Sequence, residues 1–484
     1  MSWHVRVITN RYADSVRLMG VSREVRRRDG VSRCELGIGT PANLELLAGL
    51  GAVADATPAD LVIAVEAEDG PADDALAYAE RQLSSRDAHA ASEEIHTTPP
   101  RSLAIAAGQL PGANLALISV PGEYAALEAH RALSAEMHVF LFSDHVPLEA
   151  ELELKRRGAE LGLLVMGPEC GTAMLGGVGL GFANVVRPGS VGIVAAAGTG
   201  AQESACLLDA AGAGISHIIG VGGRDLHEEI AGLGFRQAMR MLAGDDHTDT
   251  LLLVSKSPTA AGVRALARAV PDGIRTVAAF VGWNGGPAPF EVHPTLEAAA
   301  AAAARCASPD CAQLEREVDA RRPQRTGRRL LGLYSGGSLA HEAVTLLEPQ
   351  LGPISGNVGH GSPRPDGGHA LFDLGEAEYT RGRPHPMVDL QTRIEMLERA
   401  ARDERVGCVL LDVVLGHGAH PDPAGGLARA IEHTARRALP IARVCGTPDD
   451  PQDATRQEQT LTGVGAIVAP TNAAAARLAL RALR

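Results

Sequence analysis

The sequence predicts an α/β protein of several domains, in which parallel sheets carry helices on both faces. From residue 115 onward, short apolar runs alternate regularly with amphipathic stretches, as in doubly wound sheets. The chain has 484 residues, which is too long for a single hydrophobic core. Apolar residues make up 45% of the sequence and aromatic residues only 3%, so we expect cores built from Val, Leu, Ile and Ala.

The first 75 residues are expected to form a small α/β domain of their own. Strand-like and helical stretches alternate there in the order βαβαβ, which fits a ferredoxin-like or related domain and leaves the topology open. The expected strands are 5–9, 34–38 and 61–65, and the expected helices are 15–28 and 41–50. The polar stretch 67–101 predicts an exposed helix followed by a linker, and we place the linker at 76–102.

Three further domains are expected, at 103–187, 188–324 and 325–484, and a basic joint, 325–329, opens the last of them. The strands expected in these domains are 115–120, 139–142, 163–166, 191–197, 217–221, 250–254, 276–281, 330–334, 407–414, 441–444 and 466–468. Helical stretches separate them, so each domain is predicted to be a parallel α/β layer.

Charge and cysteine usage limit the partners and the location. A net charge of −13 argues against nonspecific binding to nucleic acid or to an anionic membrane surface. No secretory signal and no membrane-spanning run is apparent in the sequence. Seven cysteines are scattered singly, which is typical of reduced thiols rather than of disulfides or a zinc site. We therefore expect a cytoplasmic protein without a metal.

The turn Gly198-Thr199-Gly200 directly follows an expected strand and precedes a helical stretch. Glycines there allow an anion to approach the backbone, and the N-terminus of a helix attracts it. Thr199 and Gln202 have the spacing of a capping box, so the helix should begin at this turn. An ordinary βα turn packed with small residues is an equally good interpretation. The turn matches neither a Walker loop nor a dinucleotide fingerprint, so ATP and NAD are not indicated.

Two similar turns favour a common anion site. Gly222-Gly223 follows a strand, with Asp225 as a plausible N-cap of the next helix, and Gly336-Gly337-Ser338 repeats the arrangement in the last domain. Ligands of doubly wound sheets collect beyond the carboxyl ends of the strands. Three such helix starts are more than packing usually requires.

A fourth turn supplies further candidates for substrate binding, Glu169, Cys170, Gly171 and Thr172, after the strand expected at 163–166. Cys170 could act as a nucleophile, but no histidine lies near it in the sequence. A buried cysteine that only packs is the favoured interpretation.

Histidines are frequent in the glycine- and proline-rich loops of the last domain. They are His360, His369, His385, His417 and His420. Only His417 and His420 are close in sequence, and their spacing is not that of a metal site. They could bind or protonate an anionic substrate, or simply form hydrogen bonds with the backbone. Asp412, Asp449 and Asp450, near strand ends, could be caps or could position a substrate.

Several segments resemble succinyl-CoA synthetase. Residues 115–174, with the turn Gly167–Gly171, resemble the second half of the CoA-binding domain of its α subunit. Val191–Glu203 and Val221–Gly223 resemble later α-subunit segments, and 372–416 resembles the carboxyl-terminal domain of the β subunit. The fusion of both halves in one chain is similar to FdrA proteins. The resemblance implies Rossmann-like and flavodoxin-like parallel sheets.

Two departures from succinyl-CoA synthetase affect the chemistry. In that family the phosphorylated histidine follows the strand that corresponds to 276–281, whereas residues 282–287 of this chain contain no histidine. The glycine-rich CoA loop and the ATP-grasp domain are also absent from the sequence, so CoA binding is not expected. A phosphate cradle at Thr199 and Ser338 would remain, without the phosphohistidine that moves between the two helices.

The resemblance to FdrA proteins implies oxamate carbamoyltransferase activity, in which oxalurate and phosphate give oxamate and carbamoyl phosphate. It also implies additional subunits encoded nearby, and we expect an oligomer. In the mechanism we expect, the helix starts hold phosphate, N–H groups of Gly222 and Gly223 stabilise the oxyanion, and His417 or His420 protonates the leaving nitrogen. Phosphate is then a co-substrate, and no cofactor is needed. The alternatives are an acyl-CoA ligase with a relocated histidine and a noncatalytic scaffold that binds a small anion.

Overall fold

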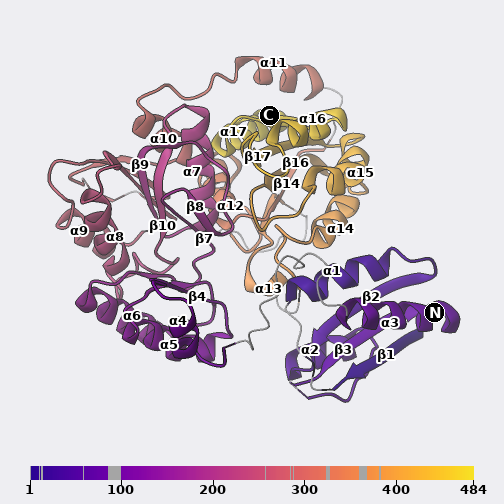
Figure 1. Ribbon diagram of the computed structural model, residues 1–484. Helices are drawn as coiled ribbons and strands as arrows, with labels where there is room; N and C mark the ends of the chain where they lie inside the picture. The colour runs from indigo at the N-terminus through magenta and orange to yellow at the C-terminus, as the bar shows by residue number, and fades with distance from the viewer. Residues whose placement is uncertain are drawn as a thin grey trace. The chain divides into compact units, whose positions relative to one another are not determined.

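The computed structural model describes residues 2–9, 11, 15–57, 59–84, 100–256, 258–283, 285–286, 288–322, 327–358, 368–380 and 383–484. They form two compact units (Figure 1). Unit 1 comprises Met1–Pro99 and Thr380–Pro384, and unit 2 comprises Pro100–Tyr379 and His385–Arg484. His360, residues 325 and 326 of the basic joint, and 85–99 of the expected linker lie outside the described residues.

Unit 1 is a three-stranded antiparallel sheet with helices on both faces. Its elements are β1 (Ser2–Ile8), α1 (Ser15–Arg26), β2 (Val31–Ile38), α2 (Pro41–Gly49), β3 (Leu61–Ala67) and α3 (Asp69–Ser84). The strand order is β1-β3-β2. The central strand alternates: Leu61, Ile63 and Val65 pack in the cluster with α1 and α3, whereas Val62 and Ala64 pack in the cluster with Leu47 of α2.

The structure shows part of helix α3 where the linker was expected. Its last nine residues, 76–84, fall inside the linker placed at 76–102, and the helix is packed rather than exposed, with Ala79 and Leu83 buried. The physical reason is an apolar stripe at 72, 75, 76, 79 and 83, which has helical spacing and faces the sheet. Polar residues between those positions make the apolar stripe difficult to recognise in the sequence.

Unit 2 begins with a small parallel sheet and its helices. The elements are α4 (Leu103–Gln109), β4 (Leu115–Ile118), α5 (Gly122–Ser134), β5 (His138–Leu141), α6 (Leu148–Leu161) and β6 (Val165–Met166). The strand order is β4-β5-β6, with parallel pairing throughout. The three expected strands of this region are present.

The main sheet of unit 2 has seven strands in the order β13-β12-β11-β9-β10-β7-β8. Its elements are β7 (Thr172–Leu175), β8 (Val178–Gly181), β9 (Pro188–Ala195), α7 (Gly198–Ala210), β10 (Ile215–Gly220), α8 (Leu233–Ala243), β11 (Thr250–Lys256), α9 (Ala260–Ala267), β12 (Arg275–Val281), β13 (Glu291–His293), α10 (Leu296–Ala304) and α11 (Ala312–Arg321). Five strands are parallel, and the hairpin β7–β8 adds an antiparallel edge that the sequence did not predict.

Strands β9, β11 and β12 are apolar on both faces, as buried parallel strands should be. On one face Ile193, Leu252 and Val277 pack in the cluster with α7 and α10. On the other face Val194, Leu253 and Ala278 pack in the cluster with α8 and α9. Figure 1 shows these helix pairs on the two sides of the sheet.

The last sheet has five parallel strands in the order β15-β14-β16-β17-β18. Its elements are β14 (Arg329–Tyr334), α12 (Gly337–Leu351), β15 (Ala370–Asp373), α13 (Ala377–Thr380), α14 (Gln391–Ala400), β16 (Val406–Val414), α15 (Pro423–Ala435), β17 (Leu439–Cys445), α16 (Ala454–Gly463), β18 (Ile467–Ala469) and α17 (Asn472–Leu483). The α/β class with parallel sheets and a small N-terminal domain is confirmed.

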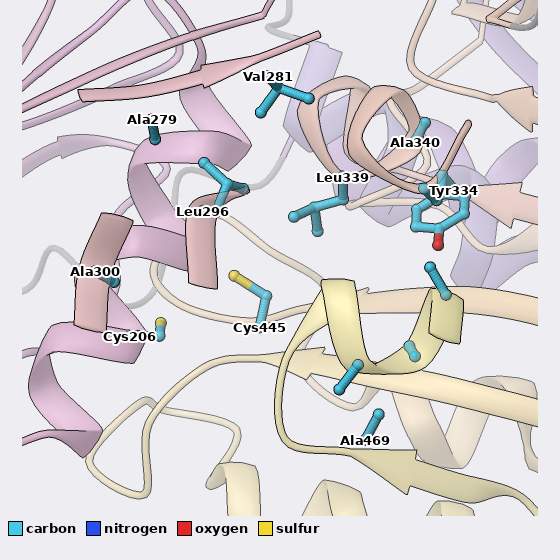
Figure 2. Packing of buried hydrophobic residues seen from close by; sticks show 14 of the residues in the cluster. Cys206, Ala279, Val281, Leu296, Ala300, Tyr334, Leu339, Ala340, Cys445 and Ala469 are labelled. Atoms are coloured by element: carbon cyan, nitrogen blue, oxygen red, sulfur yellow. The ribbon is translucent and has the colours of Figure 1, made fainter. Parts of the chain in front are cut away.

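One hydrophobic core joins the main sheet to the last sheet. Figure 2 shows Cys206 of α7 and Leu296 of α10 in the same cluster as Leu339 and Ala340 of α12 and Cys445 of β17. The small side chains of α10 and α17 let these elements approach closely. A buried ion pair between Arg443 Nε and Glu203 Oε1, 2.9 Å apart, crosses the same junction. The mutual placement of α7 and α12 therefore rests on a common core.

Among the described residues, no helix combines the length and the apolar character needed to cross a membrane.

Candidate active site

Helix α7 begins with N–H groups that the helix itself does not use. Ala201 donates the first helical hydrogen bond, to Ala197 O at 2.9 Å, so the N–H groups of Gly198, Thr199 and Gly200 precede the helical series. The N-cap is Ala197, which supplies no capping side chain. The expected capping box is wrong: the helix starts earlier than we placed it, and the Gln202 side chain instead donates to Asn184 Oδ1 and Leu415 O.

Helix α12 begins in a similar way after β14. Ala340 donates to Gly336 O at 2.9 Å, and the N-cap Gly336 has no side chain. The buried carboxylate of Asp412 accepts hydrogen bonds from the N–H groups of Ser335 and Gly336, each at 2.8 Å, and from the Ser335 hydroxyl. These bonds hold the turn in place and leave the next N–H groups, of Gly337 and Ser338, at the start of the helix.

The two helix starts lie against each other. A methyl group placed on Gly336 would be 2.9 Å from Thr199 Cβ, and one placed on Gly200 would be 3.3 Å from Ser338 Cβ. Residues about 140 positions apart in the sequence are thus in van der Waals contact. The structure therefore brings the turns at 198–200 and 336–338 into one place, with the positive ends of two helices side by side.

Lys256 adds a positive charge that sequence reasoning missed. It is the last residue of β11, and its Nζ is 3.4 Å from the position that a Cβ on Gly337 would occupy. Its Nζ is also 3.9 Å from Glu376 Oε1, and its side chain is 38% exposed. The 484-residue sequence contains only two lysines, Lys155 and Lys256. A lysine that is so rare in the chain and follows an expected strand could have indicated a functional role for Lys256.

Asp373, at the end of β15, supplies a titratable group beside the same glycine. A methyl group on Gly337 would overlap Asp373 Oδ2, while Oδ1 accepts a 2.9 Å hydrogen bond from the N–H of Gly375. Burial raises the pKa of Asp373 to about 6, although the Gly375 hydrogen bond and the charge of Lys256 oppose the shift. This carboxyl can therefore exchange a proton near neutral pH.

His385 lies beside Gly375, with Nε2 2.7 Å from the position of a Cβ on that glycine, and Asp373 Oδ1 is 3.1 Å from the same position. Burial lowers the pKa of His385 to about 4, so the ring is neutral at physiological pH. The neutral ring of His385 occupies space beside Gly375 and provides a hydrogen-bonding group, but it adds no positive charge to the site.

The turn at Gly222-Gly223 does not start a helix, which corrects one of the three expected helix starts. Helix α8 begins only at Leu233. Asp225 precedes it by eight residues, yet its carboxylate accepts hydrogen bonds from the N–H groups of Gly234 and Phe235 in the first turn, each at 3.0 Å. The buried ammonium of Lys155 fixes this arrangement by donating to Asp225 Oδ1 at 2.6 Å.

The structure places Glu169 and Thr172 near these turns. Glu169 Oε2 is 4.0 Å from the Cβ position of Gly223, and Thr172 Oγ1 is 3.3 Å from that of Gly198. Gly171 instead belongs to the hairpin, since its carbonyl accepts from the N–H of Phe182 at 2.8 Å. Glu169 and Thr172 are thus beside the carboxyl edge of the main sheet, while Gly171 supports the strand pairing.

Cys170 is sealed in the core. Its side chain lies in the cluster beneath β9 and β10, and its thiol is directed at Gly220 O, 3.4 Å away. Burial raises the pKa of Cys170 to about 12, so almost no thiolate forms at neutral pH. The packing interpretation accounts for these observations, whereas a nucleophilic or substrate-binding role does not.

We therefore expect iodoacetamide at pH 8 to label the exposed Cys306 and to leave Cys170 unmodified. Peptide mass spectrometry after a short incubation measures this directly, with Cys306→Ser as the matched control for the reactive thiol. Rapid alkylation of Cys170 in the folded chain would restore it as a candidate nucleophile.

The loop after β16 holds His417 and His420 in different ways. His417 is exposed, and its backbone N–H donates to Ala183 O at 2.7 Å. His420 Nδ1 accepts from the N–H of Asp422 at 3.0 Å, so a neutral ring carries its proton on Nε2. The loop is anchored near α7, because Asn184 donates to Leu415 O and accepts from Gln202.

Comparisons with known proteins divide the chain into two recognised regions. A CoA-ligase family model matches residues 333–482, and a model described as an AllF heavy metal-associated domain matches residues 1–99. The described residues of unit 1 do not fit a metal. They include no cluster of three His, Cys, Asp or Glu side chains suited to a metal, and Cys34 is buried, with a pKa that burial raises to about 12.

Relatives of known sequence or structure match the whole chain or a part of it. YahF of Escherichia coli, an uncharacterised protein, is 34% identical over 98% of this chain and 97% of its own length. A succinate–CoA ligase α subunit of Archaeoglobus fulgidus is 32% identical over 30% of this chain, and the match spans about half of that subunit (50%). An acetyl-coenzyme A synthetase structure from Ca. Korarchaeum cryptofilum covers 81% of the chain with 16% identity and a TM-score of 0.32.

The match to YahF extends over nearly the full length of both proteins, and the two family models account for the small first unit and for the sheet that carries α12. The chain therefore belongs to the same family as YahF, with an AllF-type N-terminal domain joined to a CoA-ligase-type, succinyl-CoA synthetase-like body.

Proposed function

We propose that unit 2 is a CoA-ligase-like transferase that holds phosphate between the starts of α7 and α12 and transfers a carbonyl-bearing group to or from it. The observation that carries the proposal is the contact of two helix starts whose N-caps, Ala197 and Gly336, provide no capping side chain. Uncapped N–H groups at a helix start favour an anion. Lys256 beside Gly337 adds the charge that a dianion requires.

In the preferred reaction the transferred group is the carbamoyl group of a ureido acid such as oxalurate. A phosphate oxygen attacks the carbamoyl carbon, the bond from that carbon to the oxamate nitrogen breaks, and the nitrogen takes a proton. The products are carbamoyl phosphate and oxamate. The absence of a histidine in residues 282–287 supports direct transfer, because no phosphohistidine is then available at the family's usual position.

Asp373 is better placed than His417 or His420 to give that proton, because its Oδ2 lies at Gly337 and its pKa is about 6. Turnover should then fall as the pH rises through about 6. In Asp373→Asn this limb of the rate profile should disappear. Phosphate itself changes its protonation state in the same pH range, so the pH profile of Asp373→Asn must be compared with that of the wild-type chain. The control is Asp403→Asn, which should keep the wild-type pH profile. If turnover still falls through about pH 6 in Asp373→Asn, another group gives the proton.

Lys256→Met should raise the KM for phosphate by about tenfold to a hundredfold, because one charge-assisted hydrogen bond is lost. The KM for the ureido acid should change much less. Steady-state kinetics with each substrate varied in turn measures this difference. Lys256→Arg keeps the charge and should recover part of the affinity. An unchanged KM for phosphate in Lys256→Met would remove Lys256 from the site.

A second candidate function is that of an acyl-CoA ligase-like enzyme, and the comparisons favour it over carbamoyl transfer. The CoA-ligase model spans 333–482, which includes Gly337, Asp373 and Asp412, and the partial relatives are succinate–CoA ligase α subunits. The same phosphate cradle would then hold an acyl phosphate. This version requires a binding place for CoA and a source of phosphoryl groups.

One assay distinguishes the two candidates. The purified chain, alone and with the subunits encoded beside it, is offered oxalurate and phosphate, and carbamoyl phosphate is trapped with ADP and carbamate kinase. In parallel it is offered acetyl or succinyl phosphate with CoA. Phosphate-dependent carbamoyl phosphate supports the transferase, and acyl-CoA supports the ligase version. No turnover from a verified complex, in either arm, would contradict both and favour a scaffold that binds a small anion.

A further inference from the structure

A cavity in unit 2 lies between the small sheet on one side and the hairpin β7–β8 and β10 on the other. Its volume is about 500 Å³, which falls in the range of small-molecule pockets. Leu115 and His138 are the first residues of β4 and β5, so the cavity is at the amino ends of that small sheet, whereas the glycine-rich turns lie at carboxyl ends.

The wall of the cavity is mostly apolar. Leu164 and Met166 line it from the small sheet, and Leu175, Leu180 and Ile219 line it from the hairpin and β10 of the main sheet. Met241 and Val178 stand at the same cavity with 41% and 64% of their surface exposed. These two side chains therefore extend the apolar surface of the cavity toward solvent.

The polar residues of the wall are Asn114, His138, His217 and Asp245. His138 Nδ1 accepts from the N–H of Leu164 at 2.9 Å, so the neutral ring carries its proton on Nε2, and burial lowers the pKa of His138, which keeps the ring neutral. The Nε2–H of His138 is therefore a donor at the cavity wall. Within the described part of the chain, this group donates no hydrogen bond.

The imidazole of His217 lies against the carboxylate of Asp245 at another part of the wall. His217 Nδ1 accepts from the N–H of Gly176, which directs the Nε2 proton toward Asp245 Oδ2, 3.4 Å away. A 2.6 Å hydrogen bond from Thr248 Oγ1 lowers the pKa of Asp245, so this carboxylate is ionised at neutral pH. A fixed negative charge at the cavity disfavours anionic ligands.

We propose that this cavity binds a neutral, apolar small molecule that carries one hydrogen-bond acceptor, which His138 Nε2–H recognises. The apolar wall contributes most of the affinity through buried surface, and the Nε2–H donor of His138 orients the ligand. The Asp245 carboxylate provides selectivity against carboxylic acids and phosphates. The site is independent of the proposed phosphate cradle, whose ligand is an anion.

The test uses N-phenyl-1-naphthylamine, a neutral apolar dye that brightens in apolar sites, with the full chain. Octan-2-one should displace the dye at a concentration about tenfold lower than octanoate, because the carboxylate of octanoate is repelled by Asp245. In His138→Phe the advantage of octan-2-one should fall about fivefold, since one hydrogen bond is lost. Displacement by octanoate as effective as that by octan-2-one would overturn the proposal.

The location is tested with matched substitutions. Leu175→Trp fills the cavity and should abolish saturable dye binding, whereas Leu127→Trp, at an exposed position on α5 outside the cavity, should leave it unchanged. Equal dye binding in the wild-type chain and in Leu175→Trp would overturn the assignment. If Leu175→Trp does not fold, the competition between ketone and carboxylate in the wild-type chain still decides the question.

Discussion

Gly200→Leu should reduce phosphate-dependent turnover by at least about a thousandfold, because it removes the positioning and the charge stabilisation of the proposed cradle together. A Cβ at this position would be only 3.0 Å from Val254 Cγ1 and 3.3 Å from Ser338 Cβ. The remaining atoms of the leucine must therefore enter the space between the helix starts or separate them. Steady-state rates at saturating phosphate measure the effect.

The control for Gly200→Leu is Gly463→Leu. Gly463 is the last residue of α16, and a Cβ there meets nothing within 4 Å, so the same substitution should leave turnover within a factor of about two. Circular dichroism spectra and melting curves should show that both variants are folded. A folded Gly200→Leu chain with wild-type turnover would place the chemistry elsewhere.

Asp412→Ala should lower the free energy of unfolding of unit 2 by about 3–5 kcal/mol, the usual cost of leaving one member of a buried ion pair alone. Asp412 and its partner Arg393 expose 0% and 2% of their side chains, with 3.3 Å between Oδ1 and the guanidinium. The substitution also removes the acceptor of the Ser335 and Gly336 N–H groups, so α12 loses the anchor of its first turn.

Denaturant titration followed by circular dichroism measures the loss, and Asp403→Ala is the matched control. Asp403 pairs with Arg329 at 3.1 Å and with Arg405 at 2.8 Å, but all three side chains are partly exposed, so its removal should cost about 1 kcal/mol or less for each pair. If Asp412→Ala destabilises the chain no more than Asp403→Ala does, Asp412 is not the structural support of the α12 turn.

Local sequence patterns were sufficient to predict the parallel strands other than β13 (Glu291–His293) and β15 (Ala370–Asp373). Val191–Ala195 and Thr250–Val254 are continuous apolar runs of strand length, and buried parallel strands have that pattern whatever surrounds them. The hairpin β7–β8 was missed because its strands are four residues each, too short for periodicity to identify. Its position at an edge of the main sheet is set by pairing with β10.

The site was only partly predictable for a similar reason. The sequence marks Gly198–Gly200 and Gly336–Ser338 as turns that follow strands, and the resemblance to succinyl-CoA synthetase implies that they share one phosphate. No local pattern shows that they touch, which follows from the shared core of α7 and α12. The roles of Lys256 and Asp373 depend on distances across different strands, which no local pattern contains. For Asp225 the local pattern was misleading. A carboxylate shortly after two glycines suggested the cap of a helix that starts there, whereas Asp225 caps a helix that begins eight residues later.

The most direct test of the central claim is isothermal titration of inorganic phosphate into the full chain and into Lys256→Met and Gly463→Leu. The proposed cradle predicts one phosphate per chain in the wild type and in Gly463→Leu, with affinity at least tenfold lower in Lys256→Met. Equal phosphate affinity in all three chains, or no binding to the wild type with or without its partner subunits, would contradict a phosphate site between α7 and α12.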